Sequence, residues 1–224
     1  MSKKIVTFAR AVLAGLYVGI AGTLYMVIDN HILGSFLFGF ALLIIVCNHL
    51  SLFTGKVGYL VTKGPKYIFK VLIIIGGNFI GIGLIALVLQ FVDISNIGDN
   101  LSQNIIGQAK IITAYKLDQH WYSILILSGL CGILMYTAVD GYNKIKNEIA
   151  KVLVVFFAVS IFILAKFEHS IADAFYFLVS GTFTWKAWGY VLLMLIGNGA
   201  GACLVCFLEK VIKDHEPKDL YPHH

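Results

Sequence analysis

Charged side chains are scarce in this chain of 224 residues. Asp, Glu, Lys and Arg make up 13% of it, whereas hydrophobic residues make up 59%. Soluble globular domains carry about 25% charged residues. The composition therefore excludes an ordinary soluble domain and predicts a protein that exposes apolar surface to lipid. No part of the chain is polar enough and long enough to form a separate soluble domain.

Six apolar stretches are each about as long as a helix that spans a bilayer, which needs roughly 20 residues. We expect an all-α integral membrane fold, with one transmembrane domain over residues 1–224. The first stretch is long and lacks a small-residue cleavage site, so no cleavable signal peptide is expected. The stretches lie near residues 8–28, 33–53, 67–92, 120–140, 150–180 and 187–208, and the fifth is interrupted.

The cations predict the orientation of the helices. Of the 17 Lys and Arg residues, 13 precede or open the first stretch or follow the second, fourth and sixth. By the positive-inside rule, both termini are expected in the cytoplasm. The net charge of +5 then reflects topology, and its spread over four short loops argues against a nucleic-acid partner. Residues 93–119 form a polar external segment, with a short amphipathic helix expected at about 101–112.

Cysteine is also rare, and its positions argue against metal or redox chemistry. The chain has 4 cysteines, all within apolar stretches, and two of them form a C-x-x-C sequence at residues 203–206. A redox or metal site needs accessible thiolates and further ligands. We therefore expect buried cysteines, no metal site and no cofactor.

An internal repeat is visible at an offset of 120 residues. Gly77-Asn78 with Gly81 matches Gly197-Asn198 with Gly201, a G-N-x-x-G sequence in both halves. His49 matches His169 at the same offset, and each begins a polar interruption. Three spans per half make the two halves inverted repeats, at about 8–92 and 120–208, with the second and fifth helices broken. Such repeats place a substrate site between the two broken segments.

Ionisable residues inside a membrane span are functional candidates. Glu168 and His169 lie well inside the fifth stretch. The alternative is a structural pair, in which Glu168 caps free backbone N–H groups and His169 is hydrogen-bonded in the core. Thr54 offers a hydroxyl to a substrate or to His169. Alternatively, Thr54 and Gly55 only terminate a helix.

Other residues are candidates for supporting or narrowing a pathway. The amides of Asn78 and Asn198 are expected to hold the backbone of the broken segments, or to join closely packed helices. Four apolar residues are candidates for constrictions on either side of a polar centre: Phe38, Leu42, Leu52 and Phe162. Alternatively, each of them belongs to the core or faces lipid.

Four strings in order resemble the formate/nitrite transporter family. They are L-F-T-G at 52–55, the two G-N-x-x-G sequences, and F-E-H-S-I-A at 167–172, which is the most specific. The resemblance covers residues 14–208. It implies an aquaporin-like protomer in a pentamer with one pore per subunit. Thr54 would match the family's loop threonine, His169 the central pore histidine and Asn198 an asparagine that faces the pore. The four apolar candidates would match the constriction residues.

The chain also departs from the family pattern. Ser51 stands where an acidic residue is usual, and Lys166 stands where a small residue usually precedes F-E-H. An extra cation beside a pore would favour anions or alter the choice of substrate. Alternatively, Lys166 reaches toward the membrane surface or pairs with Glu168.

These observations predict passage of a small monovalent anion, or its neutral weak acid, of the formate, nitrite and hydrosulfide class. We expect transport to be proton-linked through His169, in a homo-oligomer in a prokaryotic cell (inner) membrane. Its partners are then the anion, protons and lipid. Three alternatives remain: a voltage-driven anion channel without proton coupling, a pore for urea or water, and an intramembrane enzyme. No nucleophile motif or metal-ligand spacing supports an enzyme.

Overall fold

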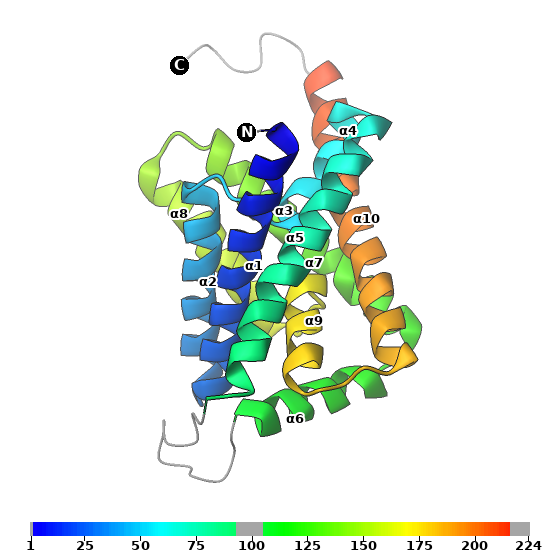
Figure 1. Ribbon diagram of the computed structural model, residues 1–224. Coiled ribbons are helices and arrows are strands. Elements are labelled where there is room, and N and C mark those ends of the chain that lie inside the picture. The colour runs from blue at the N-terminus through cyan, green and yellow to red at the C-terminus, as the bar shows by residue number, and fades with distance from the viewer. Residues whose placement is uncertain (1, 93–104, 216–224) are drawn as a thin grey trace.

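The computed structural model describes residues 2–92 and 105–215, and every regular element within them is a helix. The long helices run side by side as a bundle (Figure 1). They are α1 Lys3–Val27, α2 His31–Cys47, α5 Ile68–Leu89, α7 Trp121–Lys144, α8 Glu148–Leu164 and α10 Trp185–His215. The shorter elements are α3 Phe53–Lys56, η1 Val57–Tyr59, α4 Leu60–Lys63, η2 Pro65–Tyr67, α6 Ile105–Asp118 and α9 Ser170–Val179.

Within the described residues, four helices are long and apolar enough to cross a membrane: α1, Pro65–Leu89, α7 and α10. The helices α2 and α9 are apolar but shorter. Large apolar side chains, such as those of Leu72, Leu84 and Phe157, are exposed on the outside of the bundle. Apolar exposure on this scale suits contact with lipid and is unusual for a soluble monomer.

The helices pack in two close pairs, α1 with α5 and α7 with α10. Glycines make the close approach possible. A Cβ atom on Gly15 of α1 would lie 2.3 Å from the carbonyl oxygen of Asn78 on α5. A Cβ atom on Gly132 of α7 would lie 2.2 Å from the carbonyl oxygen of Asn198 on α10. Small residues at such crossings are typical of helices that associate in membranes.

The predicted second and fifth helices are both broken, and the two breaks have the same backbone geometry. Beyond α2, His49 has a φ of 52°, and beyond α8, Lys166 has a φ of 56°. The next residue in each case, Leu50 or Phe167, donates its N–H to a carbonyl of the preceding helix at 2.8 Å. The structural counterpart of His49 is therefore Lys166. The pairing of His49 with His169 at the 120-residue offset is wrong, because the breaks are offset by 117 residues.

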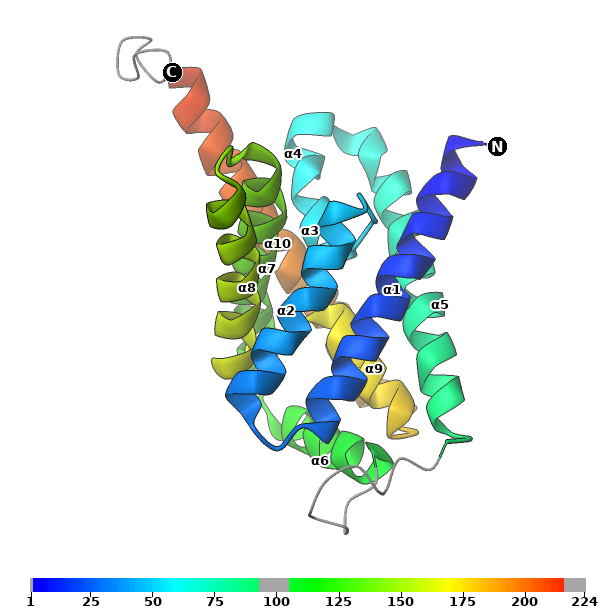
Figure 2. The ribbon, with the colours of Figure 1, turned by 90° about the vertical axis from the view of Figure 1, so that its left-hand side faces the viewer.

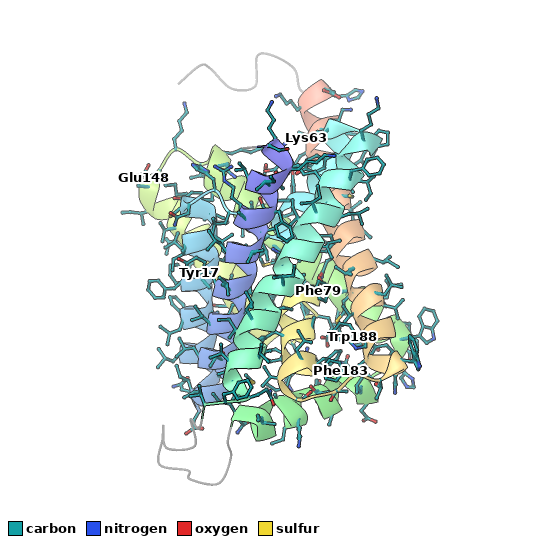
Figure 3. The ribbon with its side chains drawn as sticks, in the orientation of Figure 1. Tyr17, Lys63, Phe79, Glu148, Phe183 and Trp188 are labelled. Carbon is teal, nitrogen blue, oxygen red and sulfur yellow. The ribbon has the colours of Figure 1, made fainter. Side chains whose placement is uncertain are left out.

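The helix α6 lies across one end of the bundle, and the start of α1 and the end of α10 lie at the other end (Figures 1 and 2). The predicted interfacial helix at 101–112 is thus a helix at Ile105–Asp118, and residues 93–104 lie outside the described part. Figure 3 shows Lys63 at the end away from α6, and Phe183 and Trp188 toward the α6 end.

Candidate functional site

A buried polar pair joins the two broken segments. Thr54 is the second residue of α3, and His169 is the residue immediately before α9. Thr54 Oγ1 lies 3.1 Å from His169 Nε2, and both side chains are almost completely buried. The structure therefore brings Thr54 together with His169, which was one of the alternatives that the sequence left open for the Thr54 hydroxyl.

The second ring nitrogen of His169 fixes the tautomer of the neutral imidazole. His169 caps α9, because its Nδ1 accepts a hydrogen bond from the Ala172 N–H at 3.2 Å. A nitrogen that accepts a hydrogen bond carries no proton, so the proton of the neutral ring is on Nε2. His169 Nε2–H therefore donates to Thr54 Oγ1, and the Thr54 hydroxyl keeps its own hydrogen for another acceptor.

Two asparagines hold the backbone of the breaks. Asn78 Oδ1 accepts from the Phe53 N–H at 2.9 Å, and its Nδ2 donates to the carbonyls of Ala11 and Ser51 at 2.8 and 2.9 Å. An unpaired backbone N–H or C=O group inside the membrane would cost ~2–7 kcal/mol. Ser51 thus contributes its backbone to the support, while Gly55 packs directly against Val139 of α7.

Asn198 makes the corresponding contacts in the second half of the chain. Its Oδ1 accepts from the Ser170 N–H at 2.9 Å, and its Nδ2 donates to the carbonyls of Ser128 and Glu168 at 2.8 and 2.9 Å. The side chain is fully buried. These bonds position the residues on either side of His169, and the pore-facing role implied by the family resemblance stays a prediction.

Two hollows approach the Thr54–His169 pair from opposite ends of α2. The larger one, which we name the α6 cavity, has a volume of about 650 Å³ and is lined by residues that include Phe38, Tyr115, Lys116, Phe162, Lys166 and Asp173. The smaller one, the α3 pocket, has a volume of about 10 Å³ and is lined by residues that include Ile45, Leu52, Gly55, Lys56 and Val139. A volume of that size holds about one water molecule.

Apolar side chains separate the hollows from the polar pair. The rings of Phe38 and Phe162 meet edge to face with centroids 6.1 Å apart, and the ring of Phe162 lies 5.5 Å from that of His169. Leu52 is buried beside the α3 pocket. Leu42 is buried one turn after Phe38 and is not among the lining residues of either hollow. Of the predicted constriction residues, Phe162 contacts His169, Phe38 lines the α6 cavity and Leu52 lines the α3 pocket, and their effect on passage stays a prediction.

The pair is accompanied by a buried ion cluster that the sequence analysis missed in part. Lys116 Nζ on α6 lies 2.5 Å from Glu168 Oε2 and 2.8 Å from Asp173 Oδ1 on α9. Gln119 Nε2 donates to Glu168 Oε1 at 2.6 Å. Burial lowers the pKa of Lys116, but Asp173 and Glu168 raise it more, so its pKa is above the ordinary value and Lys116 stays charged.

One signal in the sequence could have revealed part of this cluster. Asp173 is itself an ionisable residue inside the fifth apolar stretch, so it met the criterion that selected Glu168 and His169. Lys116 lies in the polar external segment and four residues beyond the predicted interfacial helix. Nothing in the sequence indicates that it reaches back to α9, because that contact spans 52 residues.

Lys166 occupies a different position from the one that pairing with Glu168 requires. Its side chain is exposed, and Nζ lies 4.6 Å from the ring centroid of Tyr115 on α6. It lines the α6 cavity. The cation bound to Glu168 is therefore Lys116, while Lys166 contributes positive charge to the wall of the cavity.

The cysteines are all free in the described residues. Cys131 and Cys206 are buried, whereas Cys47 is exposed and its Sγ lies 3.0 Å from the Tyr142 hydroxyl. The described part of the chain also holds no group of three or more His, Cys, Asp or Glu residues that could bind a metal ion.

Comparisons with known proteins identify the family. The model described as "Formate/nitrite transporter" matches residues 2–211. The formate-nitrite transporter of Plasmodium malariae is 29% identical over 237 residues, which cover 92% of this chain and 76% of that protein. The formate-nitrite transporter of Plasmodium ovale is 28% identical over 232 residues, covering 90% and 74%.

Two solved structures share the fold. One is described as a pentameric formate channel with formate bound; it has a TM-score of 0.75 and 18% identity, over 94% of this chain and 97% of that one. The other, an FNT family ion channel, has a TM-score of 0.78 and 20% identity, over 94% and 91%. This multi-pass membrane protein therefore belongs to the formate/nitrite transporter family, whose members are transporters and channels rather than enzymes.

Proposed function

We propose that this chain conducts a small monovalent anion, or its neutral conjugate acid, past Thr54 and His169. The observation that carries the proposal is the buried Thr54–His169 hydrogen bond, which lies between the α6 cavity and the α3 pocket. The neutral His169 donates from Nε2, and the Thr54 hydroxyl has a hydrogen left to donate. Two adjacent donors among aromatic and aliphatic side chains suit a small oxygen or sulfur anion better than a cation.

Energetics favour passage as the neutral acid. Moving a bare carboxylate-sized ion into a low-dielectric medium costs of order 20 kcal/mol in the idealised limit. Protonating an acid with a pKa of ~3.9 costs about 4 kcal/mol at pH 7. Hydrogen sulfide, the conjugate acid of hydrosulfide, ionises near neutral pH, so protonating hydrosulfide at pH 7 costs almost nothing. Proton-linked transport through the site at His169 is therefore the cheaper route.

The repeated contacts support a two-fold architecture. The bonds of Asn78 and Asn198, the left-handed residues His49 and Lys166, and the crossings at Gly15 and Gly132 occur once in each half. We propose six membrane-crossing segments arranged as two inverted three-helix repeats, with an aquaporin-like path between them. The single domain then comprises both halves, joined by the external segment.

We propose that the termini are cytoplasmic and that α6 is external. The support is the bias of Lys and Arg toward the end of the bundle that holds the start of α1 and the end of α10. The prokaryotic inner membrane stays a prediction from composition, and the relatives described above come from Plasmodium.

We infer a homopentamer and a substrate of the formate, nitrite or hydrosulfide class. The structural relative at 18% identity is described as pentameric and as binding formate. On the wall of the α6 cavity, Lys166 is an exposed cation that agrees with an anionic substrate, whereas Lys116 is paired with Glu168 and Asp173. A fixed cation beside an entrance concentrates anions there through its electrostatic field.

The test is flux into proteoliposomes under an imposed pH gradient with the membrane voltage clamped. The panel contains formate, nitrite, hydrosulfide and lactate, with urea as the neutral solute. We expect faster uptake of at least one anion when the proton gradient is directed inward, with one proton entering per anion. Anion flux that follows voltage and ignores pH would establish the voltage-driven channel instead. Urea flux alone would discard the anion proposal.

A further inference from the structure

The ion cluster beside His169 contains one more carboxylate than its cation can neutralise. Lys116 Nζ contacts both Glu168 and Asp173, and the three side chains are buried. With both carboxylates ionised, the cluster would carry one net negative charge on the wall of a cavity that admits anions. A buried unpaired charge is costly, and a negative one would also repel the substrate. One bound proton removes both problems.

The contacts within the cluster indicate where that proton is. Asp173 Oδ1 faces Lys116, whereas Asp173 Oδ2 is buried and receives no hydrogen bond from any described residue. A buried carboxylate oxygen without a hydrogen-bond donor is costly, whereas a protonated carboxyl group carries no charge that needs one. Glu168 already accepts from Lys116 and Gln119, so the proton belongs on Asp173.

His169 is poorly placed to supply the proton itself. Its Nδ1 accepts from the Ala172 N–H, and a doubly protonated ring would lose that bond. The imidazolium would also stand at the N-terminus of α9, where the helix dipole disfavours positive charge. Asp173 lies in the first turn of the same helix and lines the α6 cavity. A proton on Asp173 can therefore reach an anion before the anion meets Phe38 and Phe162.

We propose that Asp173 is the proton donor for the anion in the α6 cavity, within the proton-linked passage proposed above. The Asp173 carboxyl O–H bond breaks as a bond forms between its proton and the bound anion, which gives the neutral acid and the Asp173 carboxylate. Solvent in the cavity then returns a proton to Asp173. For transport in the opposite direction, the Asp173 carboxylate accepts the proton from the arriving acid.

Other titratable groups around the cluster do not change this assignment. Cys131 on α7, Tyr176 on α9 and Tyr25 on α1 surround it. Burial favours the neutral forms of thiols and phenols. Asp29 and Lys166 line the same cavity but are exposed, and neither has an ion pair with the cluster in the described residues.

The test compares wild type with Asp173→Asn, which removes the proton site but keeps the shape and an oxygen for Lys116. Uptake from the α6 side is measured at a series of pH values, for formate and for hydrosulfide. Formate uptake by Asp173→Asn should fall roughly tenfold or more near pH 7, the low end of what a positioned acid contributes. The deficit should shrink as the α6-side solution is acidified, since neutral formic acid then enters from solution. Hydrosulfide uptake should change little.

Two further variants make the result decisive. Asp173→Glu restores a carboxyl group and should recover formate uptake near pH 7. Asp29→Asn makes the same chemical change in the same cavity without touching Lys116 and should match wild type. A pH profile of Asp173→Asn identical to wild type overturns the proposal, as does an equal loss at every pH for both substrates. If wild-type uptake itself ignores the pH gradient, the proton-linked function fails first, independently of any variant.

Discussion

His169 Nε2 and Thr54 Oγ1 lie 3.1 Å apart although 115 residues separate them in the chain. Each stands at the start of a short helix that follows a break, so the contact links the two broken segments directly. The imidazole is held at both nitrogens, because Ala172 N–H binds Nδ1 on the other side of the ring. The orientation of the Nε2–H donor is thereby fixed before any substrate arrives.

Replacing Thr54 by valine tests the hydroxyl. The shape is almost conserved, but Nε2–H of His169 loses its acceptor and the substrate loses a donor. An unpaired buried polar group costs ~1–3 kcal/mol, so we expect flux in proteoliposomes to fall about tenfold or more. Thr54→Ser keeps the hydroxyl and should retain most of the flux. Equal flux through the valine and serine variants would remove Thr54 from the transport path.

The cap on α9 separates two roles of His169. An Asn side chain can cap a helix, whereas Phe cannot. Both His169→Asn and His169→Phe should lose flux, but only the Phe variant should also lose about 1 kcal/mol of stability from the missing cap. Thermal unfolding in detergent measures the second effect, and proteoliposome flux the first. Either variant with unchanged and equally pH-dependent flux would exclude His169 from the mechanism.

Asn78 and Asn198 provide a matched comparison, because each makes three buried hydrogen bonds at corresponding places. At about 1 kcal/mol per bond, alanine at either position should cost about 3 kcal/mol of unfolding free energy. A pure support role predicts equal losses of stability for the two variants. If Asn198 also faces the pore, as the family resemblance implies, Asn198→Ala should lose more flux than Asn78→Ala at matched stability.

Much of this site could be predicted from the sequence because its residues lie in short local strings. The L-F-T-G and F-E-H-S strings identify Thr54 and His169, and both G-N-x-x-G strings identify the asparagines that support them. The pairing of His49 with His169 failed because one shared offset was assumed for the whole repeat. The asparagines are 120 residues apart, but Phe53 and Ser170, which they bind, are 117 apart. The two halves therefore differ by three residues in the length of chain between the break and the asparagine. A length difference of this size does not change the composition, so the sequence gives no sign of it.

The contact of α6 with α9 could not be predicted in the same way. Periodicity predicts a helix on the membrane surface, yet it does not say which end of that helix meets the bundle. Lys116 in the last turn of α6 is buried against Glu168 and Asp173, whereas Lys110 on the same helix is exposed. The difference depends on where the helix crosses the end of the bundle, which is a property of tertiary packing.

The ion cluster predicts a contrast between two lysines that line the same cavity. Lys116→Met leaves the buried Glu168 carboxylate without its cation, and removing one partner of a buried ion pair typically costs ~3–5 kcal/mol. Lys166→Met removes an exposed cation over Tyr115 and should change stability by less than about 1 kcal/mol. Lys166→Met should still slow anion entry at low salt, since it removes positive charge from the cavity wall.

The pH dependence of these variants follows from the raised pKa of Lys116. A group whose pKa is higher in the folded state stabilises fully below its unfolded pKa, here ~10.4, and the stabilisation is lost as the pH rises through the folded value. Deprotonation of Lys116 should therefore cause no loss of wild-type stability between pH 6 and about pH 9, as measured by thermal unfolding in detergent. A stability loss in wild type within this range that Lys116→Met does not show would mean that Lys116 loses its proton there, and Glu168 would then lack a cation.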